Sequence, residues 1–418
     1  MMKIVFLGNM NNIVFAVAKR LHEKNYDVTF LIDAPKNFLL DRPESYEPEL
    51  SGNYPAWIKE VIVKEGMRAI KFIYPNIFLK HIIQILDEYD VVFLNGFWIS
   101  LGKYLKKDKW VINVFAGFDL EFADERNIDH YVKSFYNSSW RKIFPRFAVR
   151  SFYKKSIKAQ AAGIRRADVV NYYPKGINIV GDELLESIKK GQSFKRLQLR
   201  GLICSQFPYA PPDPSKNKFV ILSITRFFFL NKRNDNKRND LMIKGIGEFI
   251  RQNKITKNLE IIFFEKGADL QAAKDMCEQE GISPFVRWTK QVSVDELTEY
   301  FKHCDVAFDQ LGDQWIGAGL FSMLTGRPLI ANARPEVFDQ LTGEATPVCQ
   351  ATTVEEISSW LTRLYQNRNL IKTIGIKSRE YVLNHYDLEK TVNFYTETFS
   401  EFRKMNKKDK VIAQVANN

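Results

Sequence analysis

The sequence lacks any long apolar run. No stretch of eighteen consecutive apolar residues occurs, and the most apolar windows, residues 3–7 and 219–224, are only as long as a β-strand. Because a helix that crosses a bilayer needs about 20 apolar residues, we expect no membrane span. The first residues enter a buried-strand pattern directly and lack the layout of a cleavable signal peptide, so a cytoplasmic protein is expected.

Cysteine and histidine are scarce and scattered. The chain has four cysteines and five histidines, with no C-x-x-C and no H-E-x-x-H motif. Structural zinc sites draw on closely spaced ligands of these two types. We therefore expect no bound metal, and reduced, buried thiols at Cys204, Cys277, Cys304 and Cys349.

The remaining composition is that of a folded, globular chain. Hydrophobic residues make up 45% and charged residues 26% of the 418 residues. These fractions exclude a disordered, collagen-like or coiled-coil protein. The length exceeds that of one ordinary hydrophobic core, so more than one domain is expected.

The formal net charge of +12 leaves three classes of partner open: nucleic acid, an anionic membrane surface and a phosphorylated substrate. The charge is uneven, because residues 133–167 carry ten basic side chains and no acidic one, interleaved with aromatic residues. Such a segment fits a solvated helix whose aromatic side chains face the core, or a surface that lies on lipid. A nucleic-acid surface has the same composition. It would need a recognition motif that this chain lacks, so no nucleic-acid partner is expected.

The chain begins with alternating strand and helix patterns. Residues 3–7 and 28–32 are short apolar runs, and apolar residues recur at helical spacing between them. This order predicts a β-α-β unit with parallel strands. Further strands are predicted at 91–94, 111–115 and 169–172, with helices between them.

A proline-rich segment divides the chain, with four prolines within residues 208–214. Proline removes a backbone donor and fixes φ, so this segment cannot continue a helix or a central strand. Strand and helix patterns then alternate again from residue 219. We therefore predict an α/β fold of two Rossmann-like domains that face a cleft. Their ranges are 1–206, a linker at 207–216, and 217–387, followed by a last helix at 388–405 and a frayed tail at 406–418.

The loops after the strands are the candidate sites, because open parallel sheets bind ligands at the carboxyl ends of their strands. Arg226 follows the first strand of the second domain, and Lys237 begins the helix that comes next. A guanidinium fork and an ammonium group that converge suit a diphosphate. The alternative is ordinary surface charge in a loop rich in Lys, Arg, Asn and Asp.

Two further loops of the second domain contain glycine beside polar residues. Glycine lets the backbone approach a ligand, and the N–H groups that open a helix can donate to a phosphate or to sugar hydroxyls. The residues are Lys266 and Gly267 after the strand at 259–264, Asp309 and Gln310 after the strand at 306–308, and Gly317 and Gly319 at the start of the next helix.

Two loops of the first domain have the same position relative to their strands. One is Gly8-Asn9-Met10-Asn11-Asn12, and the other is Ala116-Gly117-Phe118-Asp119-Leu120. The Asp119 carboxylate is the acidic group best placed to touch a reacting atom. The alternative for Asp119 is an N-cap of the segment that follows.

Taken in order, these loops resemble those of the GT-B glycosyltransferases, in particular the large retaining family that uses nucleotide-sugar donors. Arg226 and Lys237 match the pair that holds the donor diphosphate, and the run at 305–331 is similar to the donor-site signature. The other matching segments are the acceptor-domain start at 3–12, the acceptor loop at 116–120, and the C-terminal segment at 384–405, which in the family crosses back to the first domain.

One part of the donor-site signature departs from the family pattern. The family carries a pair of glutamates ahead of its Gly-x-Pro turn. Here the corresponding positions, eight apart, hold Asp313 and Phe321, with Ser322 adjacent. The carboxylate that would hold the donor ribose is therefore absent.

The resemblance implies a glycosyltransferase of the hexosyltransferase type that retains the anomeric configuration. The enzyme would move a sugar from a nucleoside-diphosphate donor to a hydroxyl of a cell-envelope glycan, such as a polysaccharide or lipopolysaccharide, or of a lipid-linked acceptor. No metal and no cofactor beyond the donor co-substrate are expected. The basic segment at 133–166 would then lie on the inner face of an anionic membrane.

The resemblance also implies roles for the loop residues. Arg226 and Lys237 would stabilise the departing diphosphate, and Asp119 would position or deprotonate the acceptor hydroxyl. The donor would contact Lys266, Gly267, Asp309, Gln310, Asp313, Gly317, Gly319 and Ser322, and the acceptor would contact Gly8, Asn9, Asn11 and Gly117.

Two other functions stay open from the sequence. A nucleotide-sugar epimerase would use the same fold, since fold does not fix function. A non-catalytic nucleotide- or sugar-binding partner in glycan assembly is the other alternative, and the missing glutamate pair favours it.

Overall fold

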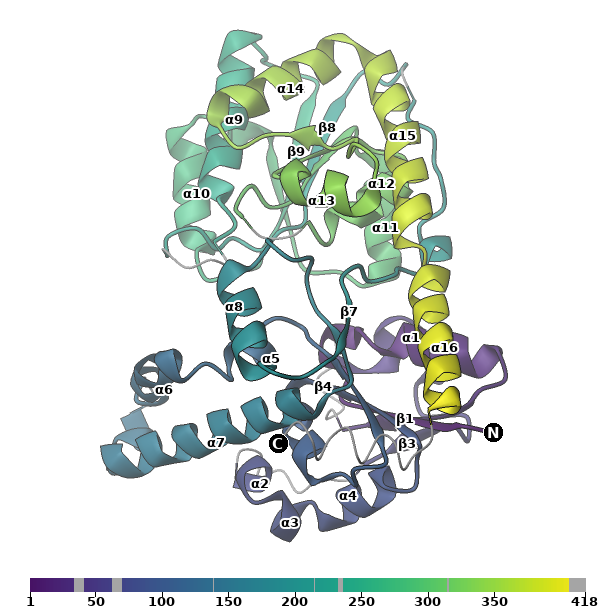
Figure 1. Cartoon of the computed structure of the whole chain (residues 1–418). Helices are drawn as coiled ribbons and strands as arrows, with labels where there is room; N and C mark the ends of the chain where they lie inside the picture. Colours follow the sequence, from purple (N-terminus) through teal and green to yellow (C-terminus); the bar gives the residue numbers. More distant parts are fainter. Residues whose placement is uncertain are drawn as a thin grey trace. The chain divides into compact units, whose positions relative to one another are not determined.

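The computed structural model describes residues 1–33, 41–61, 70–137, 139–213, 215–231, 236–313 and 316–405 (Figure 1). The chain separates into two compact units. Unit 1 contains Met1–Tyr173, Ile179–Arg200 and the chain from Leu388 onward, and unit 2 contains Pro174–Asn178 and Gly201–Asp387. Each unit is built on one parallel sheet, which confirms the predicted α/β class.

The sheet of unit 1 has seven parallel strands in the order β3-β2-β1-β4-β5-β6-β7. The predicted β-α-β start is confirmed, because β1 pairs in parallel with β2 on one side and with β4 on the other. Two edge strands, β3 and β7, were not predicted, since each is only three residues long. The strands are β1 Lys3–Leu7, β2 Asp27–Ile32, β3 Ile58–Glu60, β4 Val91–Asn95, β5 Trp110–Val114, β6 Val169–Asn171 and β7 Lys195–Leu197.

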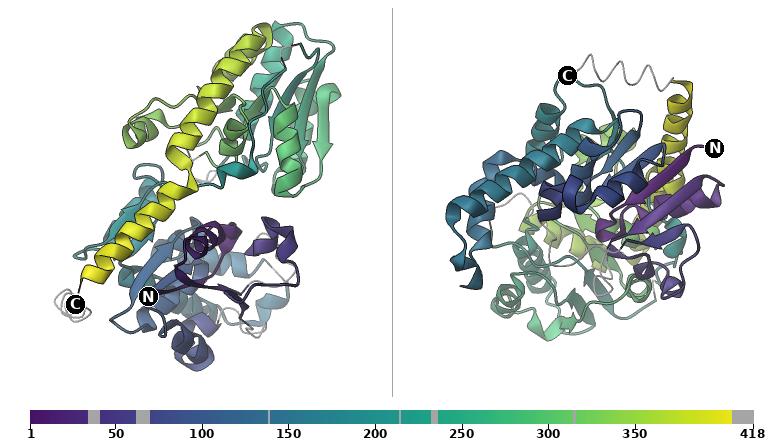
Figure 2. Two further views of the ribbon diagram at one scale, coloured as in Figure 1. Left: turned by 90° about the vertical axis from the view of Figure 1, so that its right-hand side faces the viewer. Right: turned by 90° about the horizontal axis from the view of Figure 1, so that it is seen from below.

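Helices of unit 1 cover this sheet and extend beyond it. The two halves of the long α7 have different neighbours. Its carboxyl-terminal half packs on the 3-10 helix η6, and its amino-terminal part lies beside α6 at the periphery of the unit (Figure 2). The helical elements are η1 Met10–Asn12, α1 Phe15–Glu23, η3 Pro43–Ser45, η4 Pro48–Leu50, α2 Ile70–Ile73, α3 Pro75–Phe78, α4 Lys80–Leu86, η6 Gly96–Tyr104, α5 Phe118–Glu121, η7 Glu125–Asn127, α6 Ile128–Phe135, η8 Ser139–Ile143, α7 Arg146–Arg166 and α8 Ile179–Ile188.

The sheet of unit 2 has six parallel strands in the order β10-β9-β8-β11-β12-β13. Its buried side chains form one core with the flanking helices. The strands are β8 Phe219–Ser223, β9 Leu259–Phe264, β10 Val286–Thr289, β11 Val306–Phe308, β12 Leu329–Ala331 and β13 Cys349–Gln350. The helical elements are η9 Cys204–Gln206, α9 Asn239–Gln252, α10 Leu270–Gln279, η10 Ser283–Phe285, α11 Val294–His303, α12 Gly319–Leu324, α13 Pro335–Thr342, α14 Val354–Gln366 and α15 Arg368–Tyr386.

An aspartate precedes three of the strands and holds the start of a neighbouring strand. Asp90 accepts a hydrogen bond from the Lys3 N–H at 3.0 Å, and Asp168 accepts one from the Val111 N–H at 2.8 Å. In unit 2, Asp305 accepts a hydrogen bond from the N–H of Val220, the second residue of β8, at 2.7 Å. These carboxylates satisfy backbone donors that the sheet ladder leaves open at its amino edge.

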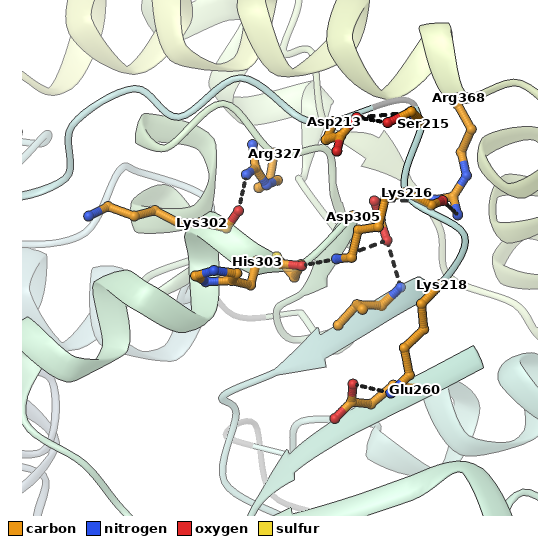
Figure 3. Close-up of polar contacts among 12 residues, drawn as sticks. Asp213, Ser215, Lys216, Lys218, Glu260, Lys302, His303, Asp305, Arg327 and Arg368 are labelled. Carbon is orange, nitrogen blue, oxygen red and sulfur yellow. Dashed lines mark hydrogen bonds and ion pairs between the residues drawn. The ribbon is translucent and has the colours of Figure 1, made fainter. Parts of the chain in front are cut away.

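The proline-rich segment is packed on unit 2 rather than free. The buried Arg327 guanidinium donates to the Ala210 carbonyl and to the Lys302 carbonyl. Farther along, Lys216 and Arg368 both pair with Asp305, with N–O distances of 3.9 and 3.2 Å (Figure 3). The segment therefore joins the core of unit 2, which begins at Gly201, earlier than the boundary expected at residue 206.

The last helix, α16 Leu388–Lys404, belongs to unit 1 and lies beside α1 (Figure 1). Its Phe402 ring stacks on Trp110 with centroids 3.7 Å apart, and Tyr395 meets Phe93 edge-on at 5.0 Å. Arg20 of α1 forms an ion pair with Glu389. The expected frayed tail at 406–418 lies outside the described residues.

The four cysteines are buried and unpaired, as expected. Burial raises the pKa of each thiol to about 12, so these thiols stay protonated and unreactive. Within the described ranges, no helix is both long enough and apolar enough to cross a bilayer.

Gly163 is the point at which α7 passes closest to η6. A Cβ atom at this position would lie 1.9 Å from the Ile99 carbonyl oxygen, which is backbone and cannot move aside. Gly163→Ala should therefore lower the unfolding temperature and cost about 1–3 kcal/mol, although alanine is the better helix former. Ser151→Ala, on an exposed position of the same helix, is the control and should be neutral or slightly stabilising. Equal unfolding temperatures for the two variants would contradict this packing.

Candidate functional site

A cavity of about 640 Å³ opens in unit 2 at the carboxyl ends of β8, β9 and β11. The loops that follow these strands supply its walls, as expected for a parallel sheet. The structure brings together here seven residues that the sequence singled out: Arg226, Lys237, Lys266, Gly267, Asp309, Gln310 and Gly317.

Three cationic side chains line this cavity. Arg226 is exposed, with its guanidinium 5.9 Å from the Phe228 ring. Lys237 donates from its ammonium group to the Gln310 side-chain oxygen. Lys266 is partly buried, and burial lowers its pKa; the nearby Arg226 lowers it further, while Asp309 opposes the shift.

Asp309 is the only carboxylate among the described residues that line the unit 2 cavity. Its Oδ1 accepts the Gln310 N–H at 2.7 Å, and its Oδ2 accepts the N–H groups of Gly317 and Gly319 at 2.8 Å each. Both oxygens of the carboxylate therefore already accept hydrogen bonds from the backbone of the loop that follows β11. The cavity keeps a positive balance that suits an anionic ligand.

The expected role of Gly317 and Gly319 is corrected by these bonds. The sequence predicted that their N–H groups would donate to a phosphate or a sugar, but both groups already donate to Asp309. Gly319 is required for packing instead, since a Cβ atom there would lie 2.6 Å from a Leu329 methyl group. Gly317 lines the cavity with open space around its Cα.

Gly267 fixes the loop that carries Lys266. Its φ is +111°, and a Cβ atom would lie 2.2 Å from the Phe227 carbonyl oxygen, so only glycine fits. The Phe227 N–H donates to the Lys266 carbonyl at 2.8 Å, which ties the loops after β8 and β9 together. The three cations are thus carried by loops that backbone hydrogen bonds join, rather than by independent loops.

Two residues that the sequence analysis missed complete this site. Asn239, at the start of α9, is buried; its side-chain oxygen accepts the Phe228 N–H at 3.0 Å and its amide donates to Thr225 at 3.3 Å. Gln291, in the loop after β10, lines the cavity. Asn239 stands two positions after Lys237 at a helix start, where an amide commonly caps a loop. Its hydrogen bonds to the neighbouring loop could therefore have been predicted from its position in the sequence.

Asp313 and Ser322 do not line the cavity, so their expected donor contacts are corrected. Ser322 is fully buried, and its hydroxyl donates to the Gly319 carbonyl at 2.7 Å. Asp313 is exposed, and its backbone carbonyl accepts from Arg334 at 2.8 Å. Phe321, at the second position of the departed glutamate pair, stacks on Phe207 with centroids 4.3 Å apart and serves packing.

A second cavity, of about 590 Å³, lies in unit 1. The loops after β1 and β4 form its polar end, where Gly8 and Asn9 were predicted to bind the acceptor. Gly8 has φ +84° and no room for a Cβ atom, which would lie 2.4 Å from the Asn95 carbonyl oxygen. Asn95 holds the same loop by accepting the Met10 N–H at 2.6 Å.

The remaining predicted acceptor residues are Gly117 and Asn11. Gly117 lies outside the lining of the unit 1 cavity; the Gly117 N–H donates to Asp119 at 2.9 Å, and its Cα packs on the Tyr173 hydroxyl. Asn11 falls in η1, and its side chain lies outside the described part of the chain.

Asp119 is a structural residue, which corrects its expected catalytic role. Its side chain is fully buried and does not line the cavity. The carboxylate accepts N–H groups from Ala116, Gly117, Leu120 and Gly96 at 2.9–3.2 Å. Burial raises the pKa of Asp119, and these donors oppose the rise. The carboxylate therefore holds the loops after β4 and β5 together and does not reach a reacting group.

The unit 1 cavity holds another acidic group that the sequence analysis did not assign. Asp33 follows β2 directly and accepts a hydrogen bond from the Trp98 indole N–H at 2.5 Å. Burial raises the pKa of Asp33, while Trp98 and the charge of Lys71 lower it. Asp33 and Trp98 are 65 residues apart in the sequence, so only the fold brings them together.

Among the described residues, no group of three or more His, Cys, Asp and Glu side chains could hold a metal ion. The two cavities offer cations and amides in unit 2, and carboxylates, amides and aromatic rings in unit 1.

No protein-family model and no curated protein sequence matches the chain. Solved structures match its fold. Anabaena HepE, in complex with UDP and glucose, is 14% identical, with a TM-score of 0.62 over 96% of this chain and 100% of HepE. WaaG, a glycosyltransferase involved in lipopolysaccharide biosynthesis, is 11% identical, with a TM-score of 0.56 over 94% of this chain and 99% of WaaG.

A third similar structure is described as a UDP-N-acetylglucosamine 2-epimerase from Listeria monocytogenes. It is 13% identical, with a TM-score of 0.54 over 97% of this chain and 98% of that one. At these identities the likeness establishes the fold, which is the two-domain GT-B fold predicted from the sequence.

The lowered pKa of Lys266 predicts how anion binding depends on pH. Because the pKa of Lys266 is lowered, this lysine loses its charge at a lower pH than an ordinary lysine. The affinity for UDP should therefore fall as the pH rises toward the usual lysine pKa of about 10.4, by up to about tenfold. Lys266→Arg stays charged over this range and should show a flatter profile. Isothermal titration calorimetry with UDP on both proteins measures the difference, and parallel profiles would contradict the assignment.

Proposed function

We propose that the protein is a glycosyltransferase that takes its sugar from a nucleoside-diphosphate donor bound in the unit 2 cavity. The observation that carries the proposal is the cluster of Arg226, Lys237 and Lys266 at the carboxyl ends of β8 and β9, beside the Asp309 carboxylate, which accepts backbone N–H groups. HepE, a protein of the same fold, holds UDP and glucose, which supports the same class of ligand here.

The chemistry of sugar transfer requires such a cluster. The bond between the anomeric carbon and the diphosphate oxygen breaks, and negative charge accumulates on the departing diphosphate. A new bond forms between the anomeric carbon and the acceptor oxygen, which loses its proton. Cations fixed before the reaction stabilise the developing charge; Arg226 offers a bidentate fork and Lys237 a point charge.

We infer retention of the anomeric configuration. Inversion needs a base at the acceptor hydroxyl, and the expected base, Asp119, has no free oxygen directed at a cavity. Among the described residues that line the unit 1 cavity, Asp33 and Asp41 are the candidate bases for an inverting route, and the raised pKa of Asp33 favours proton uptake. Analysis of the anomeric configuration of the product by NMR distinguishes the two routes.

We propose that the acceptor is a hydroxyl of a cell-envelope glycan or of a lipid-linked sugar and that unit 1 meets it at an anionic membrane. Part of the basic segment serves the core, because Val149 and Ile157 are buried there. Ile143 and Phe147, however, are 79% and 78% exposed. Cationic residues flank them in the sequence, at Arg141, Lys142, Arg146 and Arg150. Apolar side chains within a cationic surface fit a lipid interface.

The donor assignment predicts the effect of removing Arg226. Arg226→Ala should weaken UDP binding about ten- to a hundredfold, since a charge-assisted hydrogen bond contributes about 1.5–3 kcal/mol, and should reduce sugar transfer at least as much. Arg251→Ala is the matched control, because Arg251 is an exposed arginine of unit 2 that pairs with Glu248 and Glu280 outside the cavity. Equal UDP affinity in both variants would contradict the assignment.

The products separate this function from its alternatives. The chain is incubated with UDP-sugars with and without an acceptor extract, and the products are identified by mass spectrometry and NMR. A glycosylated acceptor supports the transferase. A changed sugar without any acceptor would instead indicate an epimerase, for which the similar Listeria structure is the supporting observation. UDP binding with no product would indicate a non-catalytic partner.

The membrane proposal predicts the effect of one apolar side chain. Ile143→Ser should reduce co-sedimentation with liposomes that contain anionic phospholipid by about threefold to tenfold, because it removes an inserted aliphatic group. Ile179→Ser is the control, since Ile179 is 64% exposed but lies outside the basic segment. High salt should weaken binding of the wild type. An equal loss of liposome binding in both variants, or wild-type binding that does not change with the salt concentration, would contradict the proposal.

A further inference from the structure

The unit 1 cavity has a second end that is almost entirely aromatic. Rings from four helical elements converge there: Phe97 of η6, Phe118 and Phe122 of α5, Tyr131 of α6, and Phe152 and Tyr153 of α7. Most of these rings meet edge to face, with centroids about 5–6 Å apart. Such contacts fix the rings as a wall, so this end is a preformed apolar surface.

Three of the polar side chains at the aromatic end donate to backbone carbonyls of the fold, and the others in the lining are Ser134 and the Tyr153 hydroxyl. The Ser156 hydroxyl donates to the Phe152 carbonyl at 3.1 Å, and the Tyr131 hydroxyl donates to the Glu121 carbonyl at 3.2 Å. Gln160 donates from its amide to the carbonyls of Gly96 and Asp119. A sugar ring placed here would find partners for only a few of its hydroxyls, which costs free energy, whereas a hydrocarbon chain needs none.

The opposite end of the cavity is polar. Asn9, Asp33 and Lys71 line it, and the Lys71 ammonium lies 4.9 and 5.0 Å from the ring centroids of Phe72 and Trp98. Carboxylate, amide and ammonium groups can bind the hydroxyls of a sugar. The cavity therefore divides into a polar end and an apolar end, which matches a molecule that is itself divided in this way.

The elements that form the aromatic end also carry the exposed apolar side chains. α6 contributes Tyr131 to the cavity and Phe135 to a contact with Phe144, whose ring centroid is 5.9 Å away. α7 contributes Tyr153 to the cavity and the exposed Phe147 one and a half turns earlier. The cavity wall and the basic, apolar surface are thus parts of one helical layer.

We infer that the aromatic end of the unit 1 cavity binds the hydrocarbon chain of an amphiphilic acceptor, whose sugar head occupies the end formed by Asn9, Asp33 and Lys71. The inference rests on the proposed glycosyltransferase function and selects, among its acceptors, a sugar carried on a lipid. The chain site itself depends only on the apolar wall.

A series of alkyl glucosides tests the inference on the full-length protein. Glucose and its hexyl, octyl and decyl glucosides are titrated below their micelle concentrations by isothermal titration calorimetry. The affinity should rise about three- to fourfold per methylene as the chain enters the cavity, and free glucose should bind far more weakly than octyl glucoside. An affinity independent of chain length, or glucose that binds as well as octyl glucoside, would overturn the inference.

A pair of variants assigns the binding to the cavity. Phe152→Asp places a charge in the aromatic end and should weaken octyl glucoside binding at least about tenfold. Ser151→Asp places the same charge on the exposed neighbouring position of α7 and should leave the affinity within about twofold. Equal effects of the two variants would overturn the inference. Where Phe152→Asp does not fold, the chain-length series of the wild type decides.

UDP titration of the same samples separates this inference from the function on which it rests. UDP binding without a chain-length effect would overturn the hydrocarbon site alone. A chain-length effect without UDP binding would support the hydrocarbon site and overturn the proposed glycosyltransferase.

Discussion

Aspartate carboxylates that accept backbone N–H groups hold both sheets at their edges, and both cavities depend on them. At the amino edges, Asp90, Asp168 and Asp305 each close the start of a neighbouring strand. At the carboxyl edges, Asp119 and Asp309 each gather N–H groups from loops that would otherwise leave them unpaired. A buried N–H without a partner costs about 1–3 kcal/mol, so these aspartates fix the loops that form the cavity walls.

This use of Asp309 also determines the electrostatics of the unit 2 cavity. Because its carboxylate is bound by the N–H groups of Gly317 and Gly319, it offsets the neighbouring cations only partly. Burial lowers the pKa of Lys266, Asp309 opposes this shift, and the nearby Arg226 adds to it. Bringing two like charges together without a ligand is unfavourable, and a site that tolerates this arrangement is prepared for an anion. The unit 1 cavity has no such excess and offers apolar rings instead.

Much of the fold and part of the site could be predicted from the sequence. Strand patterns and the topology of parallel sheets place Arg226, Lys237 and Lys266 at one edge, because loops after neighbouring strands must meet there. The direction of a side chain within a loop is not encoded in this way: an aspartate after a strand, such as Asp119, can face a ligand or its own backbone. Long-range pairs are also hidden, since Asp33 meets Trp98 only after β2 and η6 have packed.

The central claim is that the unit 2 cavity recognises a nucleoside diphosphate, and thermal unfolding with UDP, GDP, CMP and dTDP tests it most directly. A ligand that binds only the folded state stabilises it by mass action, by about 2.7 kcal/mol at a hundred times its Kd. The account predicts a raised unfolding temperature with one nucleoside diphosphate, and a smaller shift with the corresponding monophosphate. Unchanged unfolding temperatures with every diphosphate would contradict the account.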